Sequence, residues 1–216
     1  MGNMYGSHPN IEFVNTFEGH ADYYEGDEAT AELLERWLLD SRHNVVAAHF
    51  SGPDKVGHKW GTVSEEYRNK MLDMDQQLSS LLRFVPSNWT VVVTADHGMT
   101  ASGSHGSAEA DTRNVLALVS GPGIVPDARA DANQLDLAAL MLFELGLDFP
   151  TQVNGRVPLE ILDIPSGERS AVEVWNWEAA LERHLFFHPD DEPIFETSSV
   201  DWSGIASDPV SIRTVD

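Results

Sequence analysis

Five side chains of the types that bind divalent metal ions lie in two short clusters of this sequence. They are two aspartates and three histidines: Asp54, His58, Asp96, His97 and His105. The first two are four positions apart, the next two are adjacent, and His105 stands in the sequence Gly-Ser-His-Gly. Carboxylate oxygens combined with imidazole nitrogens suit zinc, with manganese or iron as alternatives. The set is nearly large enough to hold two divalent cations.

The sequence around these residues predicts that buried strands position them. Residues 44–50 and 89–95 are continuous apolar runs, which are typical of strands buried on both faces of a sheet. A glycine-rich loop, 51–61, follows the first run, and Asp96 directly follows the second. Ligands of α/β sheets collect at the carboxyl ends of the strands. We therefore expect all five side chains to converge on one edge of a sheet.

Apolar runs that alternate with helical patterns predict an α/β fold, with a mostly parallel sheet flanked by helices. The expected elements are a helix opened by Asp27, the strand 44–50, a helix from Ser64 to about Leu82, the strands 89–95 and 114–120, and a helix that Asn133 or Asp136 starts and that ends at Leu147. Asp27 and Ser64 are side chains that commonly cap helices. This order predicts that the metal-type residues lie in loops between strands and helices.

The character of the chain changes near Ile164, which predicts two parts. Residues 1–163 are expected to form an α/β metal-binding domain, and residues 164–216 a C-terminal acidic, Trp-rich helix and tail. The helix of this second part is expected over 173–187. Its tryptophans are expected to cover the domain, with a substrate platform as the alternative: Trp175, Trp177 and Trp202.

The composition excludes several classes of function. The net charge is −22, with 35 acidic and 13 basic residues, so the surface repels nucleic-acid phosphates and anionic membranes. The acidic residues are spread along the chain, which favours a solubilising surface suited to high salt over a surface that attracts metal ions. Cysteine is absent, which excludes disulfides and thiolate metal sites. We find no signal peptide and no apolar stretch of about 18 residues, so a soluble chain of unknown compartment is expected.

The motifs follow one another in a specific order. They are Asp54-x-x-Gly-His58-x-x-Gly, Met74-Asp75, Thr94-Ala-Asp-His-Gly-Met-Thr, Gly-Ser-His105-Gly, Asp111-Thr-Arg, Ser120-Gly-Pro-Gly and Gln134-Leu-Asp-Leu-Ala. In this order they resemble the alkaline phosphatase superfamily over about residues 27–160. The nearest branch is the type I phosphodiesterase/nucleotide pyrophosphatase group, together with the GPI ethanolamine phosphate transferases.

The resemblance implies an alkaline-phosphatase-like core and a metal-dependent hydrolase or phosphotransferase that acts on phosphate mono- or diesters. Asp54, His58 and His105 match the ligands of one metal ion, and Asp96 and His97 match ligands of a second. In the family, a Thr or Ser hydroxyl attacks phosphorus, and a further Asp completes the second site. One cation lowers the pKa of the nucleophile and the other stabilises the leaving oxygen. Two divalent ions are therefore expected, zinc first and manganese as the alternative.

Several residues near the motifs have two interpretations. Lys55 and Lys59 are two of the three lysines in the chain, and they could attract an anionic phosphate or be solvated loop charges. His49 is expected to be a hydrogen-bonded core histidine, with a supporting role behind the metal ligands as the alternative. The sequence thus marks Lys55 and Lys59 as candidate substrate-binding residues.

The nucleophile is missing from the expected set. Only 53 residues precede Asp54, and none of them forms a strand that ends in Asp and is followed by Thr or Ser at the start of a helix. Thr16 is the one candidate, whereas Asp22 and Asp27 are interpreted as surface or cap residues. No catalytic residue is therefore identified. The chain resembles the C-terminal half of such an enzyme, without the N-terminal part of the core.

Three functions remain open. The first is an enzyme, or its metal-binding part, that acts on a phosphate-ester substrate through a two-metal site. The second is a non-catalytic metal-binding fragment or subunit that needs an N-terminal half or a second chain, because an incomplete sheet exposes an edge for pairing. The third is a sulfatase or phosphate mutase of the same superfamily, and the Asp-x-x-Gly-His spacing favours the phosphodiesterase-like branch instead.

Overall fold

The computed structural model describes residues 12, 14, 16, 22–40, 42–148, 153–187 and 210–214. The chain divides into two compact units, residues 1–86 with 99–106, and residues 87–98 with 107–216. The first unit contains α1 (Tyr23–Leu39), α2 (Gly52–Trp60), α3 (Glu65–Leu81) and the 3-10 turn η1 (Leu82–Phe84). The second contains β1 (Val91–Val93), α4 (Ala110–Arg113), β2 (Leu116–Ser120), β3 (Arg129–Ala132), α5 (Gln134–Glu144), η2 (Leu159–Ile161), α6 (Ser166–Phe187) and β4 (Val210–Thr214).

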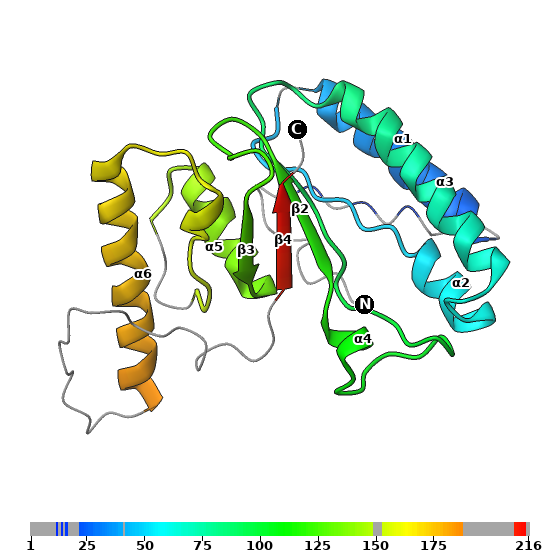
Figure 1. Cartoon of the computed structure of the whole chain (residues 1–216). Coiled ribbons are helices and arrows are strands. Elements are labelled where there is room, and N and C mark those ends of the chain that lie inside the picture. Colours follow the sequence, from blue (N-terminus) through cyan, green and yellow to red (C-terminus); the bar gives the residue numbers. More distant parts are fainter. Residues whose placement is uncertain are drawn as a thin grey trace. The chain divides into compact units, whose positions relative to one another are not determined.

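Helices α1 and α3 of the first unit lie side by side, and α2 packs against both (Figure 1). The prediction that Ser64 caps a helix is confirmed, because its Oγ accepts a hydrogen bond of 3.1 Å from Tyr67 N. Helix α1 begins earlier than predicted, with Asp22 as its cap. The interpretation of Asp27 as a cap or surface residue is wrong. Its side chain is fully buried beside Lys70, a partner 43 positions away that no local pattern indicates.

The predicted loop 51–61 contains helix α2, which is a correction that matters for the site. Pro53 lies in the first helical turn, where a missing N–H costs nothing. Gly61, with φ +77°, ends the helix. Asp54 and His58 are four positions apart, so the helix places them on the same face, one turn from each other.

The predicted strand at 44–50 is wrong for the described part of the chain. Residues 45–50 belong to no helix or strand, and they form no strand ladder with other described residues. Val45 is 46% exposed. His49 is also exposed, which contradicts its interpretation as a core histidine. An apolar run forms a buried strand only when other strands pair with it on both sides, and the run's own sequence does not show whether such strands exist.

The sheet of the second unit has the strand order β1-β2-β4-β3. The α/β content agrees with the prediction, but the mostly parallel sheet does not. Strand β2 pairs in parallel with β4, whereas the β1–β2 and β3–β4 pairs are antiparallel. The segment 94–115 between β1 and β2 is long enough for a crossover, but its only helix is the four-residue α4, and the two strands pair antiparallel. Strands β3 and β4 were not predicted at all.

The core of the second unit joins the sheet to helices α5 and α6. Its apolar residues are Ala117, Val119, Ile124, Ala130, Ala132, Ala139, Leu140, Val157, Leu159, Ile161, Leu162 and Val172. Helix α6 is longer than predicted, and its Asn176 side chain bonds to both the N–H (2.8 Å) and the C=O (3.0 Å) of Val157. Trp175 and Trp177 are half-buried on this helix, and Trp202 lies outside the described residues.

Within the described part of the chain, the helices are too short or too polar to cross a membrane.

Candidate metal site

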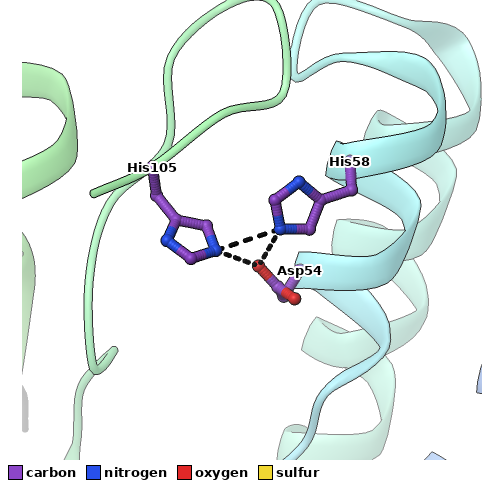
Figure 2. Close-up of side chains that lie close together, drawn as sticks. All are labelled: Asp54, His58 and His105. Atoms are coloured by element: carbon purple, nitrogen blue, oxygen red, sulfur yellow. Dashed lines mark hydrogen bonds and ion pairs between the residues drawn. The ribbon is translucent and has the colours of Figure 1, made fainter. Parts of the chain in front are cut away.

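Three of the five predicted ligands lie together in the first unit. Asp54 and His58 come from helix α2, and His105 comes from the loop 99–106. Figure 2 shows the three side chains pointing toward one another. The Nε2 atoms of His58 and His105 are 3.0 Å apart. Asp54 Oδ1 is 3.3 Å from His58 Nε2 and 3.4 Å from His105 Nε2.

These separations suit one tetrahedral cation. Bonds of about 2.0–2.1 Å from zinc to nitrogen or oxygen place neighbouring tetrahedral ligands about 3.3 Å apart. The three observed distances, 3.0, 3.3 and 3.4 Å, lie close to that value. Three protein ligands leave the fourth position open, as in catalytic zinc sites. The two imidazole nitrogens are also at hydrogen-bond distance, so the side chains can contact one another directly without a cation.

The state of Asp54 favours the metal interpretation. Its Oδ1 atom is buried and accepts no hydrogen bond from the described residues. Its neighbours His58 Nε2 and His105 Nε2 lie at ion-pair distance, 3.3 and 3.4 Å, and a buried carboxylate oxygen that accepts no hydrogen bond is costly. A cation between this oxygen and the two imidazole nitrogens would satisfy it. The donor set, one carboxylate and two imidazoles, therefore fits a zinc ion.

The loop that carries His105 also orients His58. His58 Nδ1 lies 2.8 Å from the carbonyl oxygen of Gly103, and it donates a hydrogen bond there in the Nδ1–H tautomer. This tautomer leaves the lone pair on Nε2, the atom that faces Asp54 and His105. Gly103 has φ +80°, and a Cβ on it would lie 2.0 Å from Gly57 O. Only glycine brings its carbonyl this close to helix α2.

The charged and aromatic residues around the site have distinct contacts. Lys55 Nζ is 3.5 Å from Asp54 Oδ2. Lys59 Nζ lies 5.1 Å from the ring centroid of Trp60. Burial raises the pKa of the Tyr67 hydroxyl, and the negative charge of Asp54 raises it further. The structure thus places Lys55 at the carboxylate, and Lys59 four positions further along the same helix.

The other two predicted ligands belong to the second unit, directly after β1. His97 N donates a 3.1 Å hydrogen bond to Asp96 Oδ1, and His97 Nε2 is 3.6 Å from Asp96 Oδ2. Gln134, the first residue of α5, donates to the carbonyl oxygens of Ala95 (2.7 Å) and Asp96 (2.9 Å). Gly98 N donates to Thr112 O at 2.9 Å. The hydrogen bonds from Gln134, and the one between Gly98 and Thr112, therefore fix the backbone around Asp96 and His97.

The hydroxyl of Thr16, the candidate nucleophile, is hydrogen-bonded to a residue of helix α1. Its Oγ1 lies 2.5 Å from Thr30 Oγ1. The Thr30 hydroxyl donates its own hydrogen to Gly26 O at 2.9 Å, so Thr16 donates to Thr30. Two residues that support the site were not predicted: Gly103, whose carbonyl accepts from His58, and Asp27, which contacts helix α2. For Gly103, the Gly-Ser-His-Gly motif was the available signal.

Comparison with known proteins places these motifs in a family. The sequence matches the family described as "Type I phosphodiesterase / nucleotide pyrophosphatase" over residues 5–124. GPI ethanolamine phosphate transferase 1 of Schizosaccharomyces pombe is 31% identical over 182 residues, which cover 69% of this chain and 19% of that protein. The Emericella nidulans protein of the same name is 31% identical over 170 residues, covering 65% of this chain and 18% of that protein.

A mouse relative extends the comparison. GPI ethanolamine phosphate transferase 3, catalytic subunit, of Mus musculus is 32% identical over 145 residues, which cover 65% of this chain and 13% of that protein. The chain thus spans about a fifth or less of the length of these relatives. No solved structure matches the chain significantly. The resemblance drawn from the ordered motifs is confirmed: the chain belongs to the type I phosphodiesterase/nucleotide pyrophosphatase family, whose members act on phosphoesters.

Proposed function

We propose that this chain supplies the metal-binding part of a centre that transfers or hydrolyses phosphate mono- or diesters. The observation that carries the proposal is the arrangement of Asp54 Oδ1, His58 Nε2 and His105 Nε2, within 3.4 Å of one another. In this proposal the three side chains hold one divalent cation, zinc by preference and manganese as the alternative. Membership of a phosphoester-acting family supports the choice of reaction class.

The second cation is assigned to Asp96 and His97. Two ligands are too few for a stable zinc site, so a further carboxylate is required. That carboxylate and the hydroxyl nucleophile would come from a segment or chain outside these 216 residues. Relatives named GPI ethanolamine phosphate transferases make phosphoester transfer, rather than hydrolysis alone, the favoured activity of the complete centre. Residues 164–216 are assigned to a C-terminal appendage of the domain 1–163.

The residues of this chain then have separate tasks. A divalent cation held by Asp54, His58 and His105 would supply Lewis acidity toward a phosphoryl oxygen and an attacking hydroxyl. The Gly103 carbonyl keeps the Nε2 lone pair of His58 directed at the site. Lys55 and Lys59, both on helix α2, attract the phosphate group of the substrate toward the metal site.

Zinc binding by the purified chain tests the proposal. We expect at least one zinc ion per chain by metal analysis, and a zinc affinity at least about 100-fold weaker in His58→Ala, because an imidazole ligand is lost. His184→Ala is the matched control, since this exposed histidine lies on helix α6 of the second unit. A folded chain that takes up neither zinc nor manganese would contradict the proposal.

A metal-binding subunit without catalysis is the second candidate. The observation that favours it is Thr16, whose hydroxyl is hydrogen-bonded to Thr30. Hydrolysis of p-nitrophenyl phosphate and bis(p-nitrophenyl) phosphate, measured with and without added zinc, separates the two candidates. Turnover by the chain that disappears in Asp96→Ala would exclude the non-catalytic subunit. Zinc binding without turnover would support it.

A further inference from the structure

Lys70 and Asp27 form a buried ion pair that the metal site does not itself use. Both side chains are fully buried, and Lys70 Nζ lies 2.7 Å from Asp27 Oδ2 and 2.8 Å from Asp73 Oδ2. The ring centroid of Tyr24 lies 4.3 Å from the same nitrogen. A buried ion pair is often no more stabilising than apolar residues of the same size, because desolvating two charges is costly. The stability of the fold therefore does not by itself explain why a buried ion pair, rather than two apolar residues, occupies these positions.

The second oxygen of Asp27 reaches the start of helix α2. Asp27 Oδ1 accepts a 3.2 Å hydrogen bond from Gly52 N, the first residue of that helix. Ser51 stands at the N-cap position and makes no side-chain cap hydrogen bond. The Asp27 carboxylate of α1 thus caps the N-terminus of α2 in place of the Ser51 side chain. Its negative charge is favourable at the positive end of the helix dipole.

The contact at Gly52 leaves no room for a side chain. A Cβ on Gly52 would lie 2.1 Å from Asp27 Oδ2 and 2.4 Å from Lys70 Cε. The ion pair therefore contacts the backbone of helix α2 directly, two residues before Asp54. A displacement of the pair would be transmitted to the first turn of the helix that carries Asp54 and His58.

The charge state of Lys70 keeps Asp27 in place. Burial opposes the charge of Lys70, but hydrogen bonds and charge attraction from Asp27 and Asp73 outweigh it and raise the pKa above its ordinary value. Lys70 is then protonated at neutral pH and holds Asp27 Oδ2, which leaves Oδ1 for Gly52 N.

We propose that Lys70 and Asp27 are a positioning pair for the metal site. Through the Gly52 amide they fix the first turn of helix α2, so that Asp54 Oδ1 and His58 Nε2 lie 3.3 Å apart and face His105. Neither residue touches the ligands. The inference rests on the proposed function, because it concerns how the cation site of that function is held in shape.

Two double variants of the full chain separate positioning from fold stability. Asp27→Asn with Lys70→Met removes both charges but keeps an oxygen that can accept from Gly52 N. Asp27→Leu with Lys70→Met has a similar volume and no acceptor. The probe is Co²⁺, whose absorption reports both affinity and tetrahedral geometry. Because Lys70 no longer holds residue 27 in the first variant, we expect its affinity to be about threefold weaker than that of the unaltered chain. For the second variant we expect affinity at least about tenfold weaker, with altered absorption.

Leu81→Ala is the control for general loss of stability, because Leu81 is buried at the end of helix α3. It should lower the unfolding temperature and leave the Co²⁺ affinity unchanged. Equal affinity and equal absorption in the two double variants would overturn the inference. An unaltered chain that binds no Co²⁺ or zinc would instead overturn the proposed function, and the inference with it.

Hydrogen exchange in the unaltered chain gives a test that needs no variant to fold. If the Gly52 amide and the metal site are coupled, zinc must slow exchange of this amide, since coupling between two sites is reciprocal. We expect exchange several-fold slower at Gly52 and unchanged in the interior of helix α5. Unchanged exchange at Gly52 in the zinc-bound chain would overturn the inference.

Discussion

The two clusters of metal-type residues are similar in sequence but differ in how the structure holds them. Asp54, His58 and His105 bring three ligand atoms together, and the side chain of Asp54 is 26% exposed. In the second cluster, Asp96 Oδ2 and His97 Nε2 lie 3.6 Å apart, and the side chain of Asp96 is 62% exposed. In the first cluster a loop from a distant part of the chain faces a helix. In the second, Gln134 donates to the backbone carbonyl oxygens of Ala95 and Asp96, and His97 Nδ1 lies 3.0 Å from the carbonyl oxygen of Gly98.

This difference shows what makes a metal site from a pair of motifs. Residues one helical turn apart share a face, and a third ligand from another segment completes the set. Asp96 and His97 supply only two ligand atoms, so a cation there depends on what other segments add. The first cluster is therefore expected to bind metal by itself, and the second to bind it only in a larger assembly.

The largest effect that tests this comparison is expected from Gly103→Ala. The new Cβ would meet Gly57 O at 2.0 Å, in a backbone conformation with φ +80°. We expect a loss of about 3–5 kcal/mol in the free energy of unfolding of the first unit, together with weaker zinc binding. Urea denaturation and zinc titration measure the two effects.

Gly106→Ala is the matched control for that change. Gly106 also has a positive φ, +88°, but a Cβ there would meet nothing within 4 Å. Its cost should be the conformational strain alone, about 1–2 kcal/mol. If both variants lose the same stability and zinc affinity, the approach of Gly103 to helix α2 does not hold the site together.

Local signals predicted the parts of this molecule that local interactions determine. Ser64 and Asn133 cap helices α3 and α5, as expected, and the apolar runs around β1 and β2 form strands. Helix α2 was missed because glycines and a proline are typical of loops. The four-residue spacing of Asp54 and His58 could have indicated it.

The remaining features depend on distant partners. Asp27 has the local pattern of a cap, and its burial follows from Lys70 on another helix. The sheet order required β4, which pairs between β2 and β3 from the far end of the chain. Residues 44–50 have the composition of a buried strand, and the described residues provide no flanking strands. Of the site, the sequence predicted the residue types and the grouping of Asp54, His58 and His105, but not the role of the Gly103 carbonyl.

A smaller effect is expected from Gln134→Ala in the second unit. The change removes the hydrogen bonds to the carbonyl oxygens of Ala95 and Asp96. We expect a loss of about 1–2 kcal/mol in the free energy of unfolding of the second unit. Zinc affinity at the first cluster should be unchanged, because Gln134 belongs to the second unit and the first cluster to the first. A fall in zinc affinity of the first cluster would show that the two clusters already act as one site in this chain.

The smallest effect concerns acid stability of the second unit. Burial opposes the charge of Glu160, but hydrogen bonds and charge attraction from Arg156, at 2.7 Å, outweigh it and lower the pKa of Glu160 below its ordinary value of 4.5. A lowered pKa in the folded state stabilises the unit above pH 4.5, and this contribution is lost as the pH falls through the folded-state pKa.

Glu160→Gln should therefore remove a small part of the acid sensitivity, since both residues are partly exposed and water screens the pair. Thermal unfolding of the second unit, followed between pH 3 and pH 6 in the unaltered chain and in Glu160→Gln, measures this difference. The first unit should show no change, because Arg156 and Glu160 both belong to the second unit. Parallel pH curves for the two chains would contradict the assignment of this acid sensitivity to the Arg156–Glu160 pair.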